Sequence, residues 1–156
     1  MRCLLALAVL LMAGSSSAQL RFVSQPSQLL LTGGGVGDLR LTAIWQMQSG
    51  DATIPTDKRA LLLVLDHTQV TYPNCSSVVV KTDHGVVPST VRVERGRIDC
   101  GGAETESFTV RIERERLPGL RAAKHLAFDL CGSELAVEER WLRQLRRLLA
   151  KAFDDK

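Results

Sequence analysis

The chain lacks the motifs that usually identify a chemical function from sequence. It has no Cys-x-x-Cys pair, no cysteine and histidine spacing suited to zinc, and no Gly-x-Ser-x-Gly turn around a serine nucleophile. Aromatic residues are few, with one tyrosine, two tryptophans and four phenylalanines, and they are not interleaved with basic residues. Because proteins that bind single-stranded nucleic acid stack bases on aromatic side chains in a basic groove, no nucleic-acid partner is expected.

A strong excess of charge of one sign is also absent. The chain has 20 lysines and arginines, Arg2 included, against 17 aspartates and glutamates, so the two signs of charge nearly balance. Such a balance gives no reason to expect a polyanionic partner.

No apolar run is long enough to anchor the chain in a membrane. Residues 1–18 contain Arg2, an apolar run from Cys3 to Met12, and small residues at Ser16 and Ala18. This pattern predicts a secretory signal peptide that is cleaved after Ala18. The run is too short to span a bilayer, and no cysteine follows it for lipid attachment. We therefore expect residues 19–156 to form a single secreted or periplasmic domain without a transmembrane anchor.

The glycine-rich run at residues 33–37 has the composition of a phosphate-binding loop but not its context. That loop needs a helix after it, and commonly Lys-Ser or Lys-Thr. An alternating segment follows instead, which predicts a strand with these residues on one face: Leu39, Leu41, Ala43, Trp45 and Met47. The glycines are then interpreted as a flexible hairpin connection.

Further strands are predicted from short apolar or alternating segments. Leu61–Leu65 is apolar without alternation, as in a central strand covered on both faces. Pro88 limits the segment that follows it to an edge or to the start of a strand. The charge run Arg111–Arg116 should form the solvated, frayed end of a strand, and Leu117–Ala123 a short helical turn. The other strand candidates are 29–31, 77–81, 91–93 and 108–112.

The clearest sequence pattern predicts a β-hairpin near the C-terminus. Leu126, Phe128 and Leu130 alternate with more polar residues, and Gly132-Ser133 suits a two-residue turn. That turn places Phe128 opposite Val137 and Leu130 opposite Leu135, so the large apolar residues share one face.

An amphipathic helix is predicted for residues 138–153. Its apolar stripe should pack on the sheet, although its basic outer face could instead bind an anionic membrane. The stripe comprises Trp141, Leu145, Leu148, Leu149 and Ala152. Together these segments predict a mainly β fold with a C-terminal helix (α+β), an antiparallel sheet or sandwich of about eight short strands.

Three cysteines would remain in the exported chain: Cys75, Cys100 and Cys131. Exported proteins commonly form disulfides, and an odd number leaves one thiol over. Three pairings are possible, and the residues alone do not choose among them.

Two stretches resemble a loose group of small exported bacterial proteins of unknown function. They are Thr71–Gly85, with Tyr72, Cys75 and an Asp-Gly turn, and Leu117–Leu145, with Cys131-Gly132 before a closing helix. His84 inside the turn and the additional Cys100 depart from that pattern. The resemblance implies that Cys75 pairs with Cys131 and leaves Cys100 free, and it carries no activity or cofactor.

Two Asp-His pairs, Asp66-His67 and Asp83-His84, are the main candidates for acid–base or metal chemistry. Neighbouring residues on a strand point to opposite faces, so neither pair is a ready-made dyad, but the two pairs could meet across strands. The main hypothesis is a non-enzymatic domain without a cofactor that binds an unknown protein or envelope component or has a structural role. The alternative is a small hydrolase or metal-binding protein that uses the two Asp-His pairs.

Overall fold

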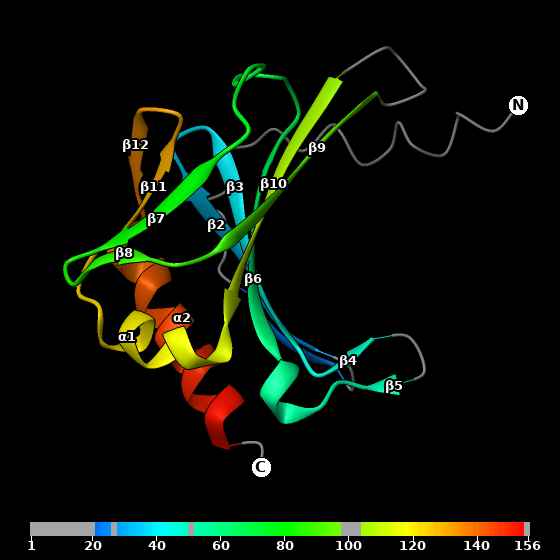
Figure 1. Ribbon diagram of the computed structural model, residues 1–156, viewed down its shortest axis with the longest axis vertical. Helices are drawn as coiled ribbons and strands as arrows, with labels where there is room; N and C mark the ends of the chain where they lie inside the picture. The colour runs from blue at the N-terminus through cyan, green and yellow to red at the C-terminus, as the bar shows by residue number, and fades with distance from the viewer. Residues whose placement is uncertain (1–20, 26–27, 50–51, 98–103, 155–156) are drawn as a thin grey trace, which may run out of the picture.

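The computed structural model describes residues 21–25, 28–49, 52–97 and 104–154, and Figure 1 shows their arrangement. The predicted signal peptide and Cys100 therefore lie outside the described residues. One sheet has six antiparallel strands in the order β1 (Arg21–Gln25), β2 (Gln28–Val36), β3 (Leu39–Gln46), β6 (Ala60–His67), β10 (Glu104–Glu113) and β9 (Thr90–Arg97). A second sheet has the order β12 (Ser133–Ala136), β11 (Leu126–Leu130), β7 (Val78–Thr82) and β8 (Gly85–Val87).

The remaining elements are short, apart from one helix. They are the hairpin of β4 (Gln48–Ser49) and β5 (Ala52–Thr53), the 3-10 turns η1 (Thr56–Lys58) and η2 (Arg114–Arg116), and the helices α1 (Leu117–Ala122) and α2 (Glu139–Asp154). The predicted fold class, mainly antiparallel β with a C-terminal helix, is confirmed. The strands that were not predicted are β1, β4, β5 and β8.

The two sheets and both helices enclose one apolar core. Leu61, Leu63 and Leu65 of β6 are completely buried, whereas Leu62 and Val64 on the other face are only half-buried. The prediction that this strand is covered on both faces was therefore wrong, because the second sheet and α2 pack on one face of the six-stranded sheet. All five residues of the predicted α2 stripe are buried, so packing of this helix is confirmed.

The glycines at 33–35 are part of β2 and not of a flexible connection, which corrects the prediction. The pairing of β2 with β3 has a bulge between Leu31 and Gly34, and the turn is confined to Gly37 and Asp38. A Cβ atom at Gly34 would overlap the indole of Trp141 on α2. Gly34 thus allows the helix to lie directly on the strand.

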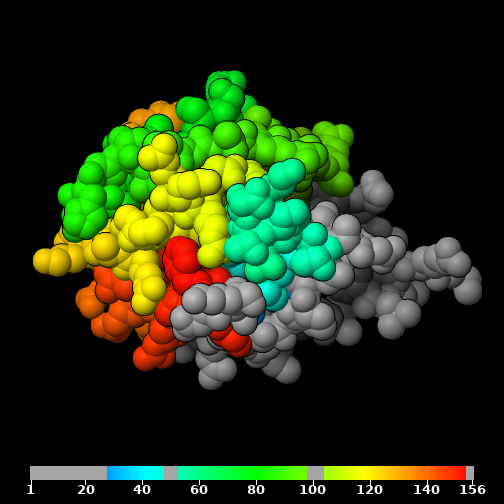
Figure 2. Space-filling model, turned by 60° about the horizontal axis from the view of Figure 1, so that its bottom comes forward, coloured from blue at the N-terminus to red at the C-terminus, as the bar shows by residue number. Residues whose placement is uncertain are grey.

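The C-terminal end of α2 lies beside α1 at the molecular surface, as Figure 2 shows.

The C-terminal hairpin keeps the predicted faces but not the predicted turn. Its loop is Cys131-Gly132, with φ of 51° and 96°, and Phe128 lies opposite Leu135. Positive φ at both central residues is the requirement of a type I′ turn, which matches the twist of the strands. The Gly132 N–H donates to Asp129 Oδ1 at 2.8 Å, which favours this turn over one at Gly132-Ser133.

The charge run at 111–116 also differs from the prediction at one residue. The guanidinium of Arg114 lies 5.8 Å from the ring centroid of Trp45 and 5.3 Å from that of Phe153. Arg114 is therefore partly buried against two aromatic rings and not fully solvated, because the chain turns into η2 after Glu113.

Candidate functional site

The loop of residues 68–77 connects β6 to β7 and so crosses from one sheet to the other (Figure 1). Within it, Tyr72-Pro73-Asn74-Cys75 forms a tight turn in which the Cys75 N–H donates to Tyr72 O at 3.0 Å. Proline is favoured at the second position of such turns because its fixed φ matches the turn. We call residues 68–77 the crossing loop.

The buried carboxylate of Glu106 accepts hydrogen bonds from the backbone of the crossing loop. Its side chain is completely buried and lies on the inner face of β10, on the same face as the buried Phe108. Oε2 accepts the N–H groups of Thr71 at 3.2 Å and Tyr72 at 3.0 Å, and Oε1 accepts Arg95 Nε at 2.9 Å. A buried carboxylate is tolerated only when it is paired and hydrogen-bonded, as it is here.

Arg95 completes the attachment by binding carbonyl groups of the same loop. It lies directly opposite Glu106 in the pairing of β9 with β10. Its Nη2 donates to Tyr72 O at 2.8 Å and to Cys75 O at 2.6 Å. Glu106 therefore binds the N–H groups of the loop and Arg95 its carbonyls, so the loop backbone is fixed on both sides.

A disulfide between Cys75 and Cys131 ties the crossing loop to the β11–β12 turn, with Cα atoms 5.6 Å apart. This is the pairing that the resemblance implied.

Tyr72, also in the crossing loop, packs its ring edge-on to that of Phe108, with the ring centroids 6.3 Å apart. Burial raises the pKa of Tyr72, and the negative charges of Asp38 and Glu106 raise it further.

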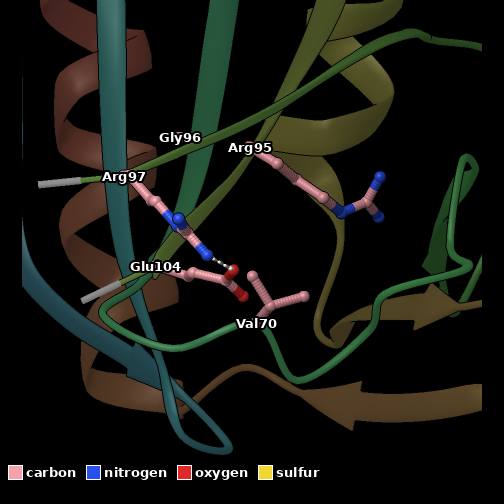
Figure 3. A pocket seen from close by; sticks show the side chains of 5 residues that line it. All are labelled: Val70, Arg95, Gly96, Arg97 and Glu104. Carbon is pink, nitrogen blue, oxygen red and sulfur yellow. Dashed lines mark ion pairs between the residues drawn. The ribbon is translucent and has the colours of Figure 1, made fainter. Parts of the chain in front are cut away.

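A pocket of about 350 Å³ lies beside the loop, lined by Val70, Arg95, Gly96, Arg97 and Glu104. Figure 3 shows Arg97 and Glu104 directed toward each other, with Nη2 and Oε1 3.5 Å apart, and the Arg95 guanidinium directed away from them. Because each arginine faces a carboxylate, the pocket carries little uncompensated charge.

His67 lies at the end of β6, but its carboxylate neighbour is not Asp66. Nδ1 lies 2.8 Å from Gln69 O and 2.9 Å from Thr71 Oγ1, and Nε2 lies 3.6 Å from Asp38 Oδ2. Asp66 belongs to the opposite face of the sheet, where it lies across from Arg40 on β3 and from Ser107 on β10 in the strand register. The alternation of strand side chains thus separates Asp66 from His67, as expected.

Asp83 and His84 form the β7–β8 turn in the other sheet. Asp83 Oδ1 accepts the N–H groups of Lys124 at 2.7 Å and His125 at 3.2 Å, and His84 Nε2 lies 3.6 Å from Asp83 Oδ2. The hydrogen bond from the His125 N–H is the main cause that lowers the pKa of Asp83. Asp83 thus fastens the turn to the segment before β11.

The two Asp-His pairs belong to different sheets, and their contacts involve different residues. Within the described ranges, no three side chains of His, Cys, Asp or Glu form a group that could hold a metal ion. Sequence reasoning missed Glu106, Arg95 and Asp38. Glu106 was recognisable, because it follows the same i, i+2 spacing as the apolar residues Phe108 and Val110.

Comparison with known proteins found no matching family model, curated protein or solved structure. None of the described helices is long and apolar enough to cross a membrane.

Proposed function

We propose that this protein is a secreted or periplasmic, non-enzymatic binding domain whose crossing loop contacts a protein or another component of the cell envelope. The observation that carries this proposal is the fixation of a loop without regular secondary structure. Glu106, Arg95 and the Cys75–Cys131 disulfide all hold its backbone. A loop that is already ordered loses less conformational entropy when it binds a partner.

The exposed side chains of the loop support the same proposal. Most are polar and uncharged, and they surround an exposed proline: Thr68, Gln69, Thr71, Pro73, Asn74, Ser76 and Ser77. Short polar side chains of this kind form hydrogen bonds to many partners, and binding loops in other proteins use them for that reason.

Site-specific photocrosslinking in the native envelope tests this proposal. A benzophenone side chain is introduced at Gln69 or at Asn74, with Arg121 on α1 as the control position. All three side chains are exposed, and α1 lies at the opposite end of the molecule from the loop (Figure 1). We expect one discrete crosslinked species from both loop positions and none from the control. Equal labelling at all three positions, or no product from the loop, would refute the proposal.

Hydrolysis at His67 is the second candidate, because an acid, a histidine and a hydroxyl meet there. Asp38 faces Nε2 and Thr71 Oγ1 faces Nδ1. However, the carbonyl of Gln69 only accepts hydrogen bonds, so its 2.8 Å contact places a proton on Nδ1. In that tautomer Nδ1 does not take a proton from Thr71, which is why binding is preferred.

An ester-hydrolysis assay with p-nitrophenyl acetate separates the two candidates. The wild type is compared with His67→Gln and Thr71→Ala under identical conditions. A binding domain should give the same slow background rate for all three proteins. A wild-type rate that both substitutions abolish would support the hydrolase instead.

A further inference from the structure

Strand β9 is an open edge of the six-stranded sheet. It has eight residues and pairs only with β10 among the described strands, whereas the other edge strands of the two larger sheets, β1, β8 and β12, have five, three and four. An edge strand exposes a row of N–H and C=O groups that can pair with another strand. β9 is therefore the longest edge in the described part of the chain that is open to a partner.

The two faces of β9 carry different side chains. Val91 and Val93 lie on the inner face and pack against the core. Arg92 and Glu94 lie on the outer face, where their side chains are 79% and 57% exposed and form an ion pair of 2.8 Å. An exposed pair of this kind is weak and is easily exchanged for another partner.

The order Arg92-Val93-Glu94 is complementary to itself when it is reversed. In an antiparallel pair of two copies with the twofold axis at Val93, residues at equal distance from Val93 lie opposite each other. Arg92 of one copy then faces Glu94 of the other, and the same contact occurs again on the other side of the axis. An axis at Arg92 or at Glu94 would instead place like charges directly opposite each other.

We infer that the protein binds a second copy of itself through antiparallel pairing of the two β9 edges, in the register that places Val93 opposite Val93. The two six-stranded sheets then form one continuous sheet across the dimer. Val93 of each copy meets its counterpart beside the core, and two Arg92–Glu94 contacts form on the outer face.

Charges on an edge strand usually prevent association, and this is the competing explanation of Arg92 and Glu94. An edge that carries one sign of charge repels every copy of itself, but β9 has both signs at positions that match in reverse. The charges therefore disfavour the registers with the axis at Arg92 or at Glu94, and they favour the register with the axis at Val93 through two opposite-charge contacts. Because the interface is narrow and its ion pairs are exposed, we expect a weak dimer that high salt weakens further.

Charge exchange tests the inference by sedimentation velocity of the exported chain at concentrations up to about 0.5 mM, which is sufficient to detect weak association. The wild type should show a concentration-dependent dimer. Arg92→Glu and Glu94→Arg should each raise the dissociation constant at least about tenfold, since each places like charges opposite at two points. An equimolar mixture of the two variants should associate again, and so should the double variant, because both combinations restore opposite charges.

The control is Glu113→Arg on β10, which alters a similar pair between residues two apart, Arg111–Glu113 at 2.8 Å, away from the edge. Its dimer should match the wild type. All variants are first checked by thermal unfolding, which should be unchanged because these side chains are exposed. A wild type that stays monomeric at the highest concentration would overturn the inference. A dimer that neither charge reversal weakens would also overturn it.

Discussion

The buried carboxylate of Glu106 connects the packing of the sheet to the order of the crossing loop. It stands where an apolar residue would continue the inner face of β10, and it accepts hydrogen bonds from Arg95, Thr71 and Tyr72. The two oxygens of one charged group accept all of these hydrogen bonds, so a substitution here removes several contacts at once.

Glu106→Ala should lower the free energy of unfolding by about 3 kcal/mol, because it leaves two partly buried N–H groups without their acceptor and Arg95 without its buried ion-pair partner. Glu106→Gln keeps one acceptor oxygen and should cost about half as much. Urea unfolding measures both values. Glu104→Ala is the control, since its pair with Arg97 is exposed and its loss should cost at most about 0.5 kcal/mol. Equal effects at positions 104 and 106 would contradict the assignment of Glu106 as the anchor.

Asp83 should make stability depend on acid. Its pKa is lowered in the folded protein, first by the N–H of His125, so the folded state favours the carboxylate. This contribution is fully present above the ordinary pKa of the unfolded chain and is lost as the pH falls through the lowered pKa of the folded state. Asp83→Asn should therefore be less stable than the wild type near neutral pH.

The difference between Asp83→Asn and the wild type should shrink as the pH is lowered from about 5 to about 2. Thermal unfolding across that range measures it. The carboxylate of Asp129 on β11, whose pKa is also lowered, mainly by Lys81, is unchanged in both proteins and cancels from the comparison. A difference that stays constant or grows toward low pH would contradict the role of Asp83.

At the scale of elements, the approach of α2 to β2 depends on a single missing side chain. Gly34→Ala should lower the free energy of unfolding by at least about 2 kcal/mol, because the added Cβ overlaps the buried Trp141 indole. The matched control is Gly96→Ala on β9, where an added Cβ would meet only Thr105 Oγ1 at 3.6 Å. That change should be neutral or stabilise by about 0.5 kcal/mol. Chemical denaturation of both variants tests the contrast, and equal destabilisation would show that Gly34 does not limit the packing.

At the scale of the whole molecule, the disulfide joins the crossing loop, which connects the two sheets, to the β11–β12 turn. It closes a loop with a sequence separation of 56 residues. In the chain-entropy model, a loop of that length corresponds to about 4 kcal/mol of stabilisation at 25 °C. The double variant Cys75→Ala with Cys131→Ala should lose about this amount in urea unfolding. Cys100→Ser, which leaves the pair intact, should unfold like the wild type, and non-reducing peptide mapping should recover Cys75 joined to Cys131. A peptide that joins Cys75 to Cys100 would contradict the pairing.

Much of the fold could be predicted, because periodicity reports which face of an element is buried. The stripe of α2 and the shared face of Phe128 and Leu135 follow from spacing alone. The turn at Cys131-Gly132 did not follow, since Cys131 adopts a φ that a non-glycine residue rarely takes. The candidate site was largely missed for a related reason, because Glu106, Arg95 and the crossing loop are distant in the chain and meet only when β9, β10 and the loop are packed.

The sequence by itself determined the class of fold, the apolar faces of its strands and its closing helix, and it predicted export. These properties depend on the spacing of apolar residues and on composition, both of which can be taken directly from the sequence. Only the tertiary structure decided that Asp38 and not Asp66 faces His67, that the two Asp-His pairs stay in different sheets, and that Glu106 and Arg95 hold the crossing loop. Those contacts depend on strand register and on the order of strands in a sheet, which a few hydrogen bonds between distant residues select.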